Sequence, residues 1–476
     1  MQTKLHNYNH TKIIATLGPA SESSEMIQKL IRAGADCFRL NFSHKNAEEF
    51  EPVIQRIRGI SKSEDSYIPI IADIQGPKLR IGRLPVEGVI LKDNDTFTIT
   101  ARDIGVGNAQ EVETSYKNLS KDAVIGGRIL LSDGTIELSV EKISDTDISC
   151  RVLIGGTLFS NKGMNLPGAK LSIDTLTEKD IKDLKFIAKS DIDMIAVSFV
   201  RSAEDIKRVR EIIGNTRTPV IAKLERPEAL ENLDEILEQA DGALIARGDL
   251  GVETPFETVP YMQKQILERS AAMGKWVTVA TQMLLSMVRH NRPSRAEVSD
   301  VSNAVIDGAD AIMLSEETAI GSYPVSAVEA MVKIAKEAEK NMQNIPPNID
   351  AKKAVFSVSA AGAAVSAAER LGAKAIMPLA GSGLTALHIS KWRPGRLILA
   401  LSANESTLRR LNVLRGVIPV YLEKHMDMEN QIKIADQFLL ERNCAIKGDT
   451  VVIVAAVPLG KGAETNTIRF HRVKGA

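Results

Sequence analysis

Val220-Ile221-Ala222-Lys223-Leu224-Glu225 is the stretch that most constrains the fold. It is a short apolar run, typical of a buried β-strand, and it ends in a lysine and a glutamate. Seven more runs of this kind occur along the chain: Lys12-Ile13-Ile14-Ala15-Thr16, Phe38-Arg39-Leu40-Asn41-Phe42-Ser43, Ile70-Ile71-Ala72-Asp73, Ile195-Ala196-Val197-Ser198-Phe199, Leu244-Ile245-Ala246-Arg247-Gly248-Asp249, Val277-Thr278-Val279-Ala280-Thr281-Gln282 and Ile312-Met313-Leu314-Ser315-Glu316-Glu317. Eight such runs, separated mostly by helix-length segments, predict a (β/α)₈ TIM barrel whose strand C-termini carry the chemistry.

Two further units are expected beside the barrel. Between the third and fourth barrel strands, alternating segments with Asp-Gly and Asn-Asp turns predict a small β-barrel or sandwich, placed to act as a lid. After the eighth strand, the breaker cluster Asn344-Ile345-Pro346-Pro347-Asn348 marks a boundary, and alternating strands and helices then predict a small open α/β domain. We therefore expect a catalytic barrel over 1–78 and 171–343, a β-rich lid domain over 79–170 and a C-terminal α/β domain over 344–476.

Composition is typical of a soluble metabolic enzyme. The 476 residues include 60 basic and 60 acidic ones, so no long-range field attracts nucleic acid or an anionic membrane. The three cysteines are far apart and lack CxxC spacing, which argues against a disulfide framework or a zinc site. No signal-peptide pattern and no membrane-length apolar run is found, so we expect the cytoplasm.

The fifth and sixth apolar runs suggest a metal site. Lys223 and Glu225 lie two apart on one strand and so share a face, and Asp249 is expected at the end of the next strand. A carboxylate pair suits Mg²⁺, and a neighbouring lysine suits stabilisation of a transferring phosphoryl group. The alternative is a buried Lys-Glu ion pair that closes the barrel top.

The segment Arg247-Gly248-Asp249-Leu250-Gly251 is interpreted as a glycine-rich turn, and Val252 to Val259 just beyond it is expected to lead into a helix. Glycine here lets backbone N–H groups approach an anion closely, although most such loops only turn the chain.

Other strand ends carry polar groups as well. Arg39, Asn41 and Ser43 alternate on the second strand and should face one side, which is costly unless they bind a ligand or form a hydrogen-bonded cluster in the core. Thr281 and Ser315, with Glu317, offer hydroxyl and carboxylate groups for proton transfer.

In combination, these motifs resemble those of the pyruvate kinase family over nearly the whole chain. The matching segments are Thr11-Lys12-Ile13 through Ala20, Arg39-Leu40-Asn41-Phe42-Ser43-His44, Asp73 through Arg80, Ile221 through Glu225, Ala246 through Glu253, Ala280 through Leu284 and Met313 through Ala319. The resemblance implies transfer of the phosphoryl group of phosphoenolpyruvate to ADP, followed by protonation of the enolate. The products would be pyruvate and ATP, as in the final step of glycolysis.

The resemblance also implies roles for individual residues. Glu225 and Asp249 would hold Mg²⁺ or Mn²⁺, while Arg39 and Lys223 contact the transferring phosphoryl group. The substrate carboxylate would meet the backbone N–H groups of Gly248 and Asp249 and the hydroxyl of Thr281. The remaining roles are protonation of the enolate, through Thr281, Ser315 and Glu317, and nucleotide binding, through Asn41, His44, Arg80 and Lys162. Lys162 and Asp133 of the lid would make contacts on closure.

A monovalent-cation site is the feature in which family members differ. Many members hold K⁺ through groups that match Asn41, Ser43, Asp73 and position 74, where this chain has Ile74. Those members carry glutamate where this chain has Lys78. Members with lysine there tend not to need K⁺, because an ammonium can neutralise the same cluster internally. We therefore expect K⁺-independence.

Regulation and assembly are inferred from the same resemblance. A Thr/Ser-Gly-rich loop in the C-terminal domain often holds an effector phosphate, and this chain retains Ser382, Gly383 and Thr385 but has Ala380 where a hydroxyl residue is usual. A sugar phosphate or a nucleotide would be the effector, and a homotetramer the assembly. Two other functions stay open: a metal-dependent aldolase or lyase acting on an enolate, and a catalytically silent sensor of sugar phosphates.

Overall fold

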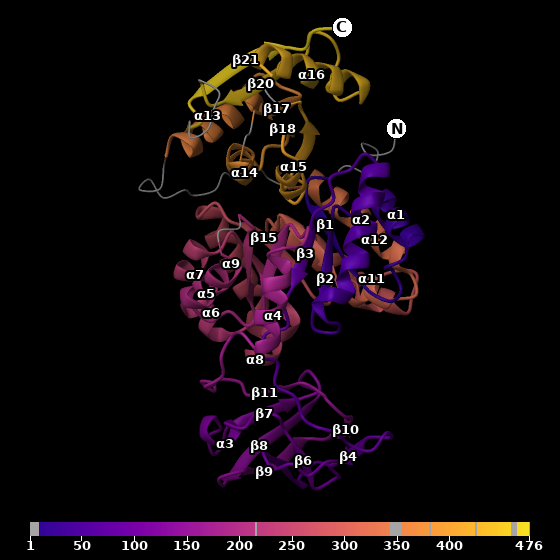
Figure 1. Ribbon diagram of the computed structural model, residues 1–476, viewed down its shortest axis with the longest axis vertical. Helices are drawn as coiled ribbons and strands as arrows, with labels where there is room; N and C mark the ends of the chain where they lie inside the picture. The colour runs from indigo at the N-terminus through magenta and orange to yellow at the C-terminus, as the bar shows by residue number, and fades with distance from the viewer. Residues whose placement is uncertain are drawn as a thin grey trace.

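The computed structural model describes residues 9–214, 217–342, 355–379, 382–423, 426–457 and 464–475. Within these ranges, eight parallel strands close into a barrel in the order β1-β16-β15-β14-β13-β12-β3-β2 (Figure 1). The strands are β1 Lys12–Leu17, β2 Cys37–Asn41, β3 Ile70–Asp73, β12 Met194–Val197, β13 Val220–Leu224, β14 Gly242–Ala246, β15 Trp276–Ala280 and β16 Ala311–Leu314. Each coincides with one of the eight apolar runs, so the predicted TIM barrel is confirmed.

Helices surround the barrel, and the longer ones, such as α1, α5 and α12, present an apolar stripe to the strands. In α1 (Ser24–Ala33) the Ser23 side chain accepts from the Met26 N–H at the start, and Gly34, at φ 116°, ends the helix. The other helices of this layer are α2 Glu51–Ser63, α4 Glu178–Ile187, α5 Ala203–Ile213, α6 Pro227–Glu231, α7 Leu233–Gln239, α8 Arg247–Glu253, α9 Val259–Ala272, α10 Arg295–Ile306, α11 Glu316–Ala319 and α12 Pro324–Lys340. Short 3₁₀ turns are η1 Ala47–Phe50, η2 Phe256–Thr258 and η3 Leu285–Val288.

The structure corrects the predicted end of the sixth strand. β14 ends at Ala246, and α8 begins at Arg247, so Asp249 lies in the first turn of a helix and not on a strand. The pairing partner explains the difference: Ala246 is opposite Ala280, the last residue of β15, and Thr281 then turns to φ 67°. Because β15 ends at Ala280, β14 has no partner beyond Ala246 with which to continue the parallel hydrogen-bond ladder, and helix α8 begins at the next residue. The expected glycine-rich turn over 247–251 is therefore wrong, whereas the segment 252–259 does lead into a helix, α9 Val259–Ala272.

The segment between β3 and α4 forms a β-rich unit with a core of its own. In this fully described stretch, one sheet has six strands in the order β11-β7-β8-β9-β5-β6, and a second pairs β10 with β4. The strands are β4 Val89–Leu91, β5 Thr96–Thr100, β6 Glu111–Glu113, β7 Arg128–Leu131, β8 Ile136–Ile143, β9 Asp147–Ile154, β10 Gly156–Leu158 and β11 Met164–Asn165, with the short helix α3 Leu119–Asp122. We call this unit, β4 to β11, the lid.

The C-terminal unit is an α/β sheet in the order β19-β18-β17-β20-β21, as far as the described residues extend. Its elements are α13 Phe356–Arg370, β17 Ala375–Pro378, α14 Leu384–Lys391, β18 Leu397–Ser402, α15 Glu405–Leu411, β19 Val417–Tyr421, α16 Met428–Glu441, β20 Thr450–Ala455 and β21 Thr467–Arg472. The sequence pattern does not indicate β19 or the antiparallel edge strand β21. The breaker cluster at 344–348 lies outside the described residues.

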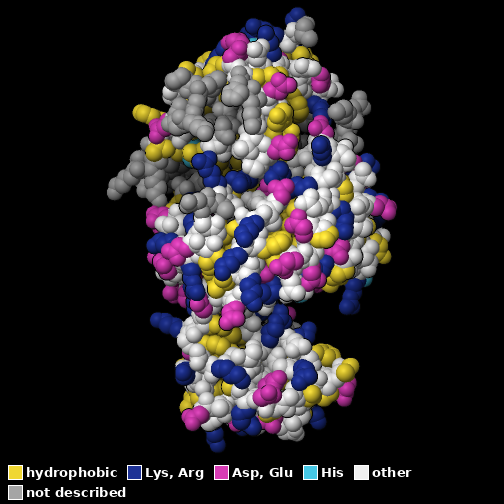
Figure 2. Space-filling view, in the orientation of Figure 1, with side chains coloured by type: hydrophobic (Ala, Val, Ile, Leu, Met, Phe, Trp, Pro, Cys, Tyr) yellow, Lys and Arg dark blue, Asp and Glu magenta, His cyan; other side chains and the backbone are white. Residues whose placement is uncertain are grey.

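The lid and the C-terminal unit lie at opposite ends of the barrel (Figure 1). The lid adjoins the C-terminal ends of the barrel strands, and the space-filling view narrows between lid and barrel (Figure 2). At the other end, buried polar contacts fix the C-terminal unit: Lys391 pairs with Asp310, Trp276 Nε1 donates to the Val413 carbonyl at 2.8 Å, and Lys12 Nζ donates to that of Val417 at 2.9 Å.

None of the helices in the described ranges combines the length and the apolar character that a bilayer crossing requires.

Candidate active site

A buried ion cluster lies at the C-terminal ends of β2, β3 and β13. The Lys223 ammonium is 3.2 Å from Asp73 Oδ1 and 3.0 Å from Glu225 Oε1, and it donates to the Ser198 hydroxyl at 2.7 Å. Arg39 binds the other oxygen of Asp73 at 2.7 Å. Because parallel strands end at the same edge, three separate segments of sequence bring these charges together, and a fourth supplies Ser198.

Burial and charge act against each other in this cluster. Burial alone would lower the pKa of Lys223, but the carboxylates of Asp73 and Glu225 outweigh it and raise that pKa. Burial alone would raise the pKa of Asp73, but the positive charges of Lys223 and Arg39 outweigh it, and the pKa is lowered. For Glu225 burial prevails, with Asp249 adding to it, and the pKa is raised despite Lys223. The lysine is therefore a fixed positive charge.

Glu225 and Asp249 are the carboxylates that fit a divalent cation. Glu225 is almost fully buried, and its second oxygen accepts from the Phe199 N–H at 2.8 Å, while the side chain of Asp249 is 29% exposed. No cluster of three or more acidic, histidine or cysteine ligands forms a complete metal cage among the described residues. Mg²⁺ commonly takes one or two carboxylates and completes its shell with water and substrate oxygens, so this donor pair fits it.

Lys78 lies between Asp249 and the lid. Its ammonium is 3.7 Å from Asp249 Oδ1, and its Cε would be 3.3 Å from a Cβ atom built on Gly163 of the lid. Lys78 thus contacts Asp249 and the lid. The sequence analysis instead expects its ammonium to neutralise the monovalent-cation cluster that includes Asp73. The reason is that Gly76, at φ 66°, turns the chain between the two residues.

The other residues expected at a monovalent-cation site lie at the end of β2 and β3. Asn41 ends β2, and its side-chain oxygen accepts from the Ser43 N–H at 3.1 Å, so Ser43 is in the turn after the strand and not on it. Ile74 is fully buried and supplies no side-chain oxygen. Its carbonyl already accepts from the Ser198 hydroxyl at 2.8 Å.

Gly248 and Thr281 meet across the same edge. The Gly248 N–H donates to the Thr281 hydroxyl oxygen at 2.7 Å, and that hydroxyl donates to the Ala280 carbonyl at 2.6 Å. The first contact satisfies a backbone donor in the first turn of α8. The Gly248 N–H and the Thr281 hydroxyl thus lie together at the N-terminus of α8, where the helix dipole favours negative charge.

Ser315 and Glu317 directly follow β16, the strand next to β15, but differ in exposure. Ser315 follows β16 and is partly exposed, whereas Glu317 is 1% exposed. The two oxygens of Glu317 accept from the N–H groups of Leu284 and Ser315, at 3.0 and 2.7 Å. Its pKa is raised by burial, against these bonds. Glu317 therefore braces both loops, and since each carboxylate oxygen keeps a second lone pair, its role in proton transfer stays a prediction.

Of the residues expected to bind nucleotide, Arg80, His44 and Asn41 lie on one side of the cluster. Burial lowers the pKa of the His44 imidazole, and the positive charges of Arg80, Arg39 and Lys78 lower it further. Arg80 Nη1 donates to the Asn161 carbonyl of the lid at 2.9 Å. Lys162 is exposed on the lid. The side chains thus form a positively charged rim suited to phosphates.

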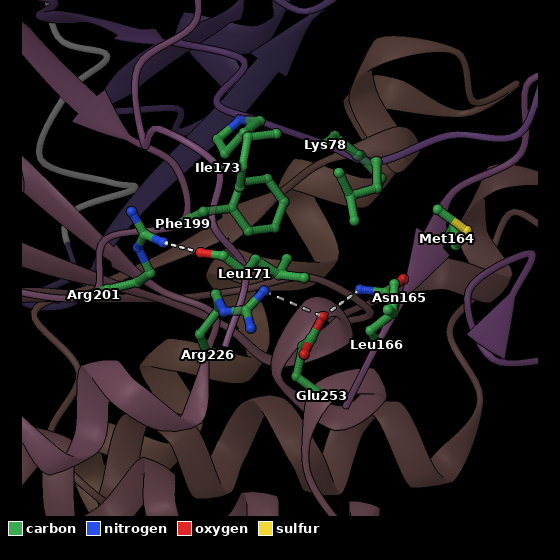
Figure 3. Close-up of a pocket in the computed structure, with 12 residues that line it drawn as sticks. Lys78, Met164, Asn165, Leu166, Leu171, Ile173, Phe199, Arg201, Arg226 and Glu253 are labelled. Atoms are coloured by element: carbon green, nitrogen blue, oxygen red, sulfur yellow. Dashed lines mark hydrogen bonds and ion pairs between the residues drawn. The ribbon is translucent and has the colours of Figure 1, made fainter. Parts of the chain in front are cut away.

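The hinge between barrel and lid encloses a cavity of about 20 Å³, room for about one water molecule (Figure 3). Asn165 of the lid donates to Glu253 Oε1 at 2.6 Å, and Arg226 lies 3.9 Å from the same oxygen. Glu253 Oε2 is buried and has no hydrogen-bond partner among the described residues. Arg201 donates to the Leu171 carbonyl at 3.1 Å and holds the segment that returns from the lid to the barrel.

Sequence reasoning missed these hinge residues, as it missed the part that Ser198 plays at Lys223. Ser198 could have been found, since it ends the fourth apolar run. The pairing of Asn165 with Glu253 leaves no local signal, because the two residues are far apart in sequence.

The loop expected to hold an effector phosphate is described only in part, since Ala380 and Gly381 lie outside the described residues. Ser382 is exposed, and Gly383 has φ 89°. The Thr385 and Thr465 hydroxyls are 2.6 Å apart.

Comparison with known proteins agrees with this geometry. A family model described as pyruvate kinase, barrel domain, matches residues 8–328, and one described as pyruvate kinase, alpha/beta domain, matches residues 359–471. A pyruvate kinase of Thermotoga maritima is 41% identical over 465 residues, which cover 97% of this chain and 99% of the relative. A pyruvate kinase of Mycobacterium tuberculosis is 40% identical over 469 residues, covering 97% of this chain and 98% of the relative.

A solved structure is similar as well. The crystal structure of a pyruvate kinase from Cryptosporidium parvum superposes with a TM-score of 0.91 at 34% identity, covering 98% of this chain and 97% of that one. With family models that match both the barrel and the C-terminal unit, and relatives near 40% identity along the whole chain, we conclude that this chain belongs to the pyruvate kinase family of enzymes, which are transferases and kinases of glycolysis.

Proposed function

We propose that this enzyme transfers the phosphoryl group of phosphoenolpyruvate to ADP at the C-terminal end of the barrel, beneath the lid, and then protonates the enolate to give pyruvate and ATP. The observation that carries the proposal is the Lys223 ammonium, which two buried carboxylates hold at 3.0 and 3.2 Å beside Arg39. A positive charge that is already in position stabilises the transferring phosphoryl group in the transition state, because the protein does not have to reorganise around it.

Lys223 and Arg39 would bind the equatorial oxygens of the transferring group. Both cations are held by Asp73, so they converge on one point instead of repelling each other apart. Phosphoryl transfer demands little covalent chemistry from the protein, and positioning with electrostatic stabilisation supplies most of the rate.

At the other side of the site, the substrate carboxylate would take the N–H groups of Gly248 and Asp249 and the hydroxyl of Thr281. The Thr281 and Ser315 hydroxyls lie on the face from which the enolate carbon would receive its proton, through a relay that includes water. Glu317 would act through its two backbone bonds, by keeping both loops in place.

Glu225 and Asp249 would hold Mg²⁺ or Mn²⁺. The bound cation supplies Lewis-acid stabilisation of charge on the substrate oxygens. ADP phosphates would lie against Arg80, with Asn41, His44 and, on lid closure, Lys162 and Asp133. The position of Lys78 at the lid side of Asp249 suits neutralisation of the same phosphates.

We further propose that K⁺ is not required. The Ile74 side chain offers no oxygen ligand, its carbonyl is occupied, and Asp73 is already neutralised by two cations. Lys78 lies on the Asp249 side of the site, so the cations already present at the Asp73 edge are Arg39 and Lys223. Unit positive charges about 4 Å apart repel by about 4 kcal/mol at an effective dielectric of about 20, so a second cation is disfavoured.

The C-terminal unit would regulate the enzyme, with a sugar phosphate or nucleotide bound near Ser382, Gly383 and Thr385, in a cytoplasmic homotetramer. The neighbouring hydroxyls of Thr385 and Thr465 support a phosphate contact there.

A coupled assay with lactate dehydrogenase tests the activity. Phosphoenolpyruvate with ADP and Mg²⁺ should yield pyruvate, and omission of ADP should abolish it. An aldolase or lyase would release pyruvate without ADP, and a silent sensor would release none; either result would refute the proposal.

A further inference from the structure

Thr281 and Gln282 have an unusual backbone conformation. Their φ angles are 67° and 54°, in the left-handed region that β-branched residues such as threonine rarely adopt. Two consecutive residues in this region persist where surrounding contacts determine them, and such strain gathers at functional sites. In this conformation, directly after β15, the hydroxyl of Thr281 accepts from the Gly248 N–H at 2.7 Å.

Arg247 is the side chain that holds the turn. Its Nη2 donates to the Thr281 carbonyl at 2.9 Å and lies 2.8 Å from Met283 Sδ, while Nη1 binds Asp300 Oδ1 of α10 at 2.6 Å. The Arg247 side chain is 11% exposed. A planar guanidinium presents its donors in a fixed fork, so Asp300 at one nitrogen orients the other nitrogen toward the carbonyl.

The guanidinium also links the two halves of the carboxylate site. Arg247 is the first residue of α8, directly before Gly248, and it binds the backbone of Thr281 on the neighbouring loop. Movement of α8 therefore moves the Thr281 loop with it. Glu317 and Glu297 bind the same loop further on, at Leu284 and Ser286, whereas Arg247 binds the backbone carbonyl of the left-handed Thr281 itself.

We propose that Arg247, oriented by Asp300, is a positioning residue that fixes the left-handed turn at Thr281 and so sets the Thr281 hydroxyl against Gly248. The consequence for catalysis rests on the proposed function of Thr281. Arg247 acts through Thr281 and touches neither the substrate nor the metal.

The first test is structural and independent of activity. Crystal structures of two variants, Arg247→Met and Arg247→Lys, test the turn directly. In Arg247→Met, Thr281 should leave the left-handed region and its hydroxyl should lose the contact with the Gly248 N–H. Lysine keeps the charge without the fork, so it should preserve the turn in part. A methionine variant with Thr281 at an unchanged φ would overturn the proposal, whatever the enzyme's activity.

The second test is kinetic. Arg247→Met should lower kcat by roughly 10-fold to 100-fold, while the Mg²⁺ concentration for half-activation stays within about 2-fold of the parent. The rate at which the C3 protons of pyruvate exchange with D₂O should fall in parallel. This exchange passes through the enolate and needs no phosphoryl transfer. Arg289→Met, an exposed arginine on the same loop, is the matched control and should leave both rates unchanged.

A double-variant cycle separates action through Thr281 from any other effect. If Arg247 acts through Thr281, then Arg247→Met combined with Thr281→Val should be no slower than Thr281→Val alone. Losses that multiply would overturn the proposal. A parent without any activity toward phosphoenolpyruvate and ADP would instead refute the proposed function and leave the structural test to decide on the turn.

Discussion

Replacement of Lys223 by methionine removes the charge at the centre of the site while it keeps an unbranched side chain of similar length. In the structure the lost ammonium contacts Asp73, Glu225 and the Ser198 hydroxyl. Asp73 retains Arg39, and Glu225 retains the Phe199 N–H. The variant therefore has an undercompensated acidic cluster and no lysine for the phosphoryl group.

Two magnitudes follow. Unit charges about 3 Å apart attract by about 5 kcal/mol at an effective dielectric of about 20, and removal of one partner of a buried pair costs about 3–5 kcal/mol of stability. On catalysis, the loss of one preorganised electrostatic contact corresponds to about 10²-fold to 10³-fold in kcat. We expect kcat to fall by at least about 10²-fold, with much less change in KM.

Steady-state kinetics and urea unfolding measure the two losses, and Lys391→Met is the matched control. The Lys391 side chain is 4% exposed, against 11% for Lys223, and pairs with Asp310, but at the opposite end of the barrel. Both variants should lose stability, and the large loss of kcat should appear in Lys223→Met alone. A Lys223→Met enzyme with near-normal kcat, or a Lys391→Met enzyme with an equal loss, would refute the reasoning.

Four further predictions follow from individual contacts. Glu225→Gln and Asp249→Asn keep shape but remove charge, so each should shift Mg²⁺ activation to higher concentration; titrations that overlay the parent would make the pair structural. Activity in a tetramethylammonium buffer free of K⁺ and Na⁺ should stay close to that with KCl added, and Lys78→Glu should create a K⁺ requirement; strong K⁺ activation of the parent would contradict this. Burial, with the charge of Arg415, lowers the pKa of His10 to about 4, so as the pH falls the unfolded chain binds the proton before the folded chain does. The free energy of unfolding should therefore fall between pH 6.5 and pH 4, by up to about 3 kcal/mol. In His10→Asn this fall should be smaller, as measured by the free energy of unfolding against pH. Asn165→Ala takes a hydrogen bond from a buried carboxylate and should cost about 1–3 kcal/mol in thermal unfolding, and an unchanged melting curve would be evidence against the hinge contact.

The barrel strands were predictable because a buried parallel strand must be apolar on both faces. Each of the eight runs lies on a barrel strand, although the polar residue at the end of the run commonly falls just beyond the last hydrogen-bonded pair, as Asp249 does. Strand β21 could not be found in the same way, because an edge strand has only one covered side and its residues Thr467–Arg472 are largely polar.

The candidate site divides along the same line. The sequence determined which residue types stand at the strand ends, and because parallel barrel strands end at one face, it also placed Arg39, Asp73, Lys223 and Glu225 at one edge. The tertiary structure decided which atoms pair. Lys78 pairs with Asp249, and both oxygens of Glu317 accept from backbone N–H groups. Thr281 adopts a left-handed conformation, and its carbonyl accepts from Arg247. Periodicity carries information about which face of an element is buried, whereas side-chain partners depend on turns and on residues distant in sequence, and these are fixed only when the whole chain has packed.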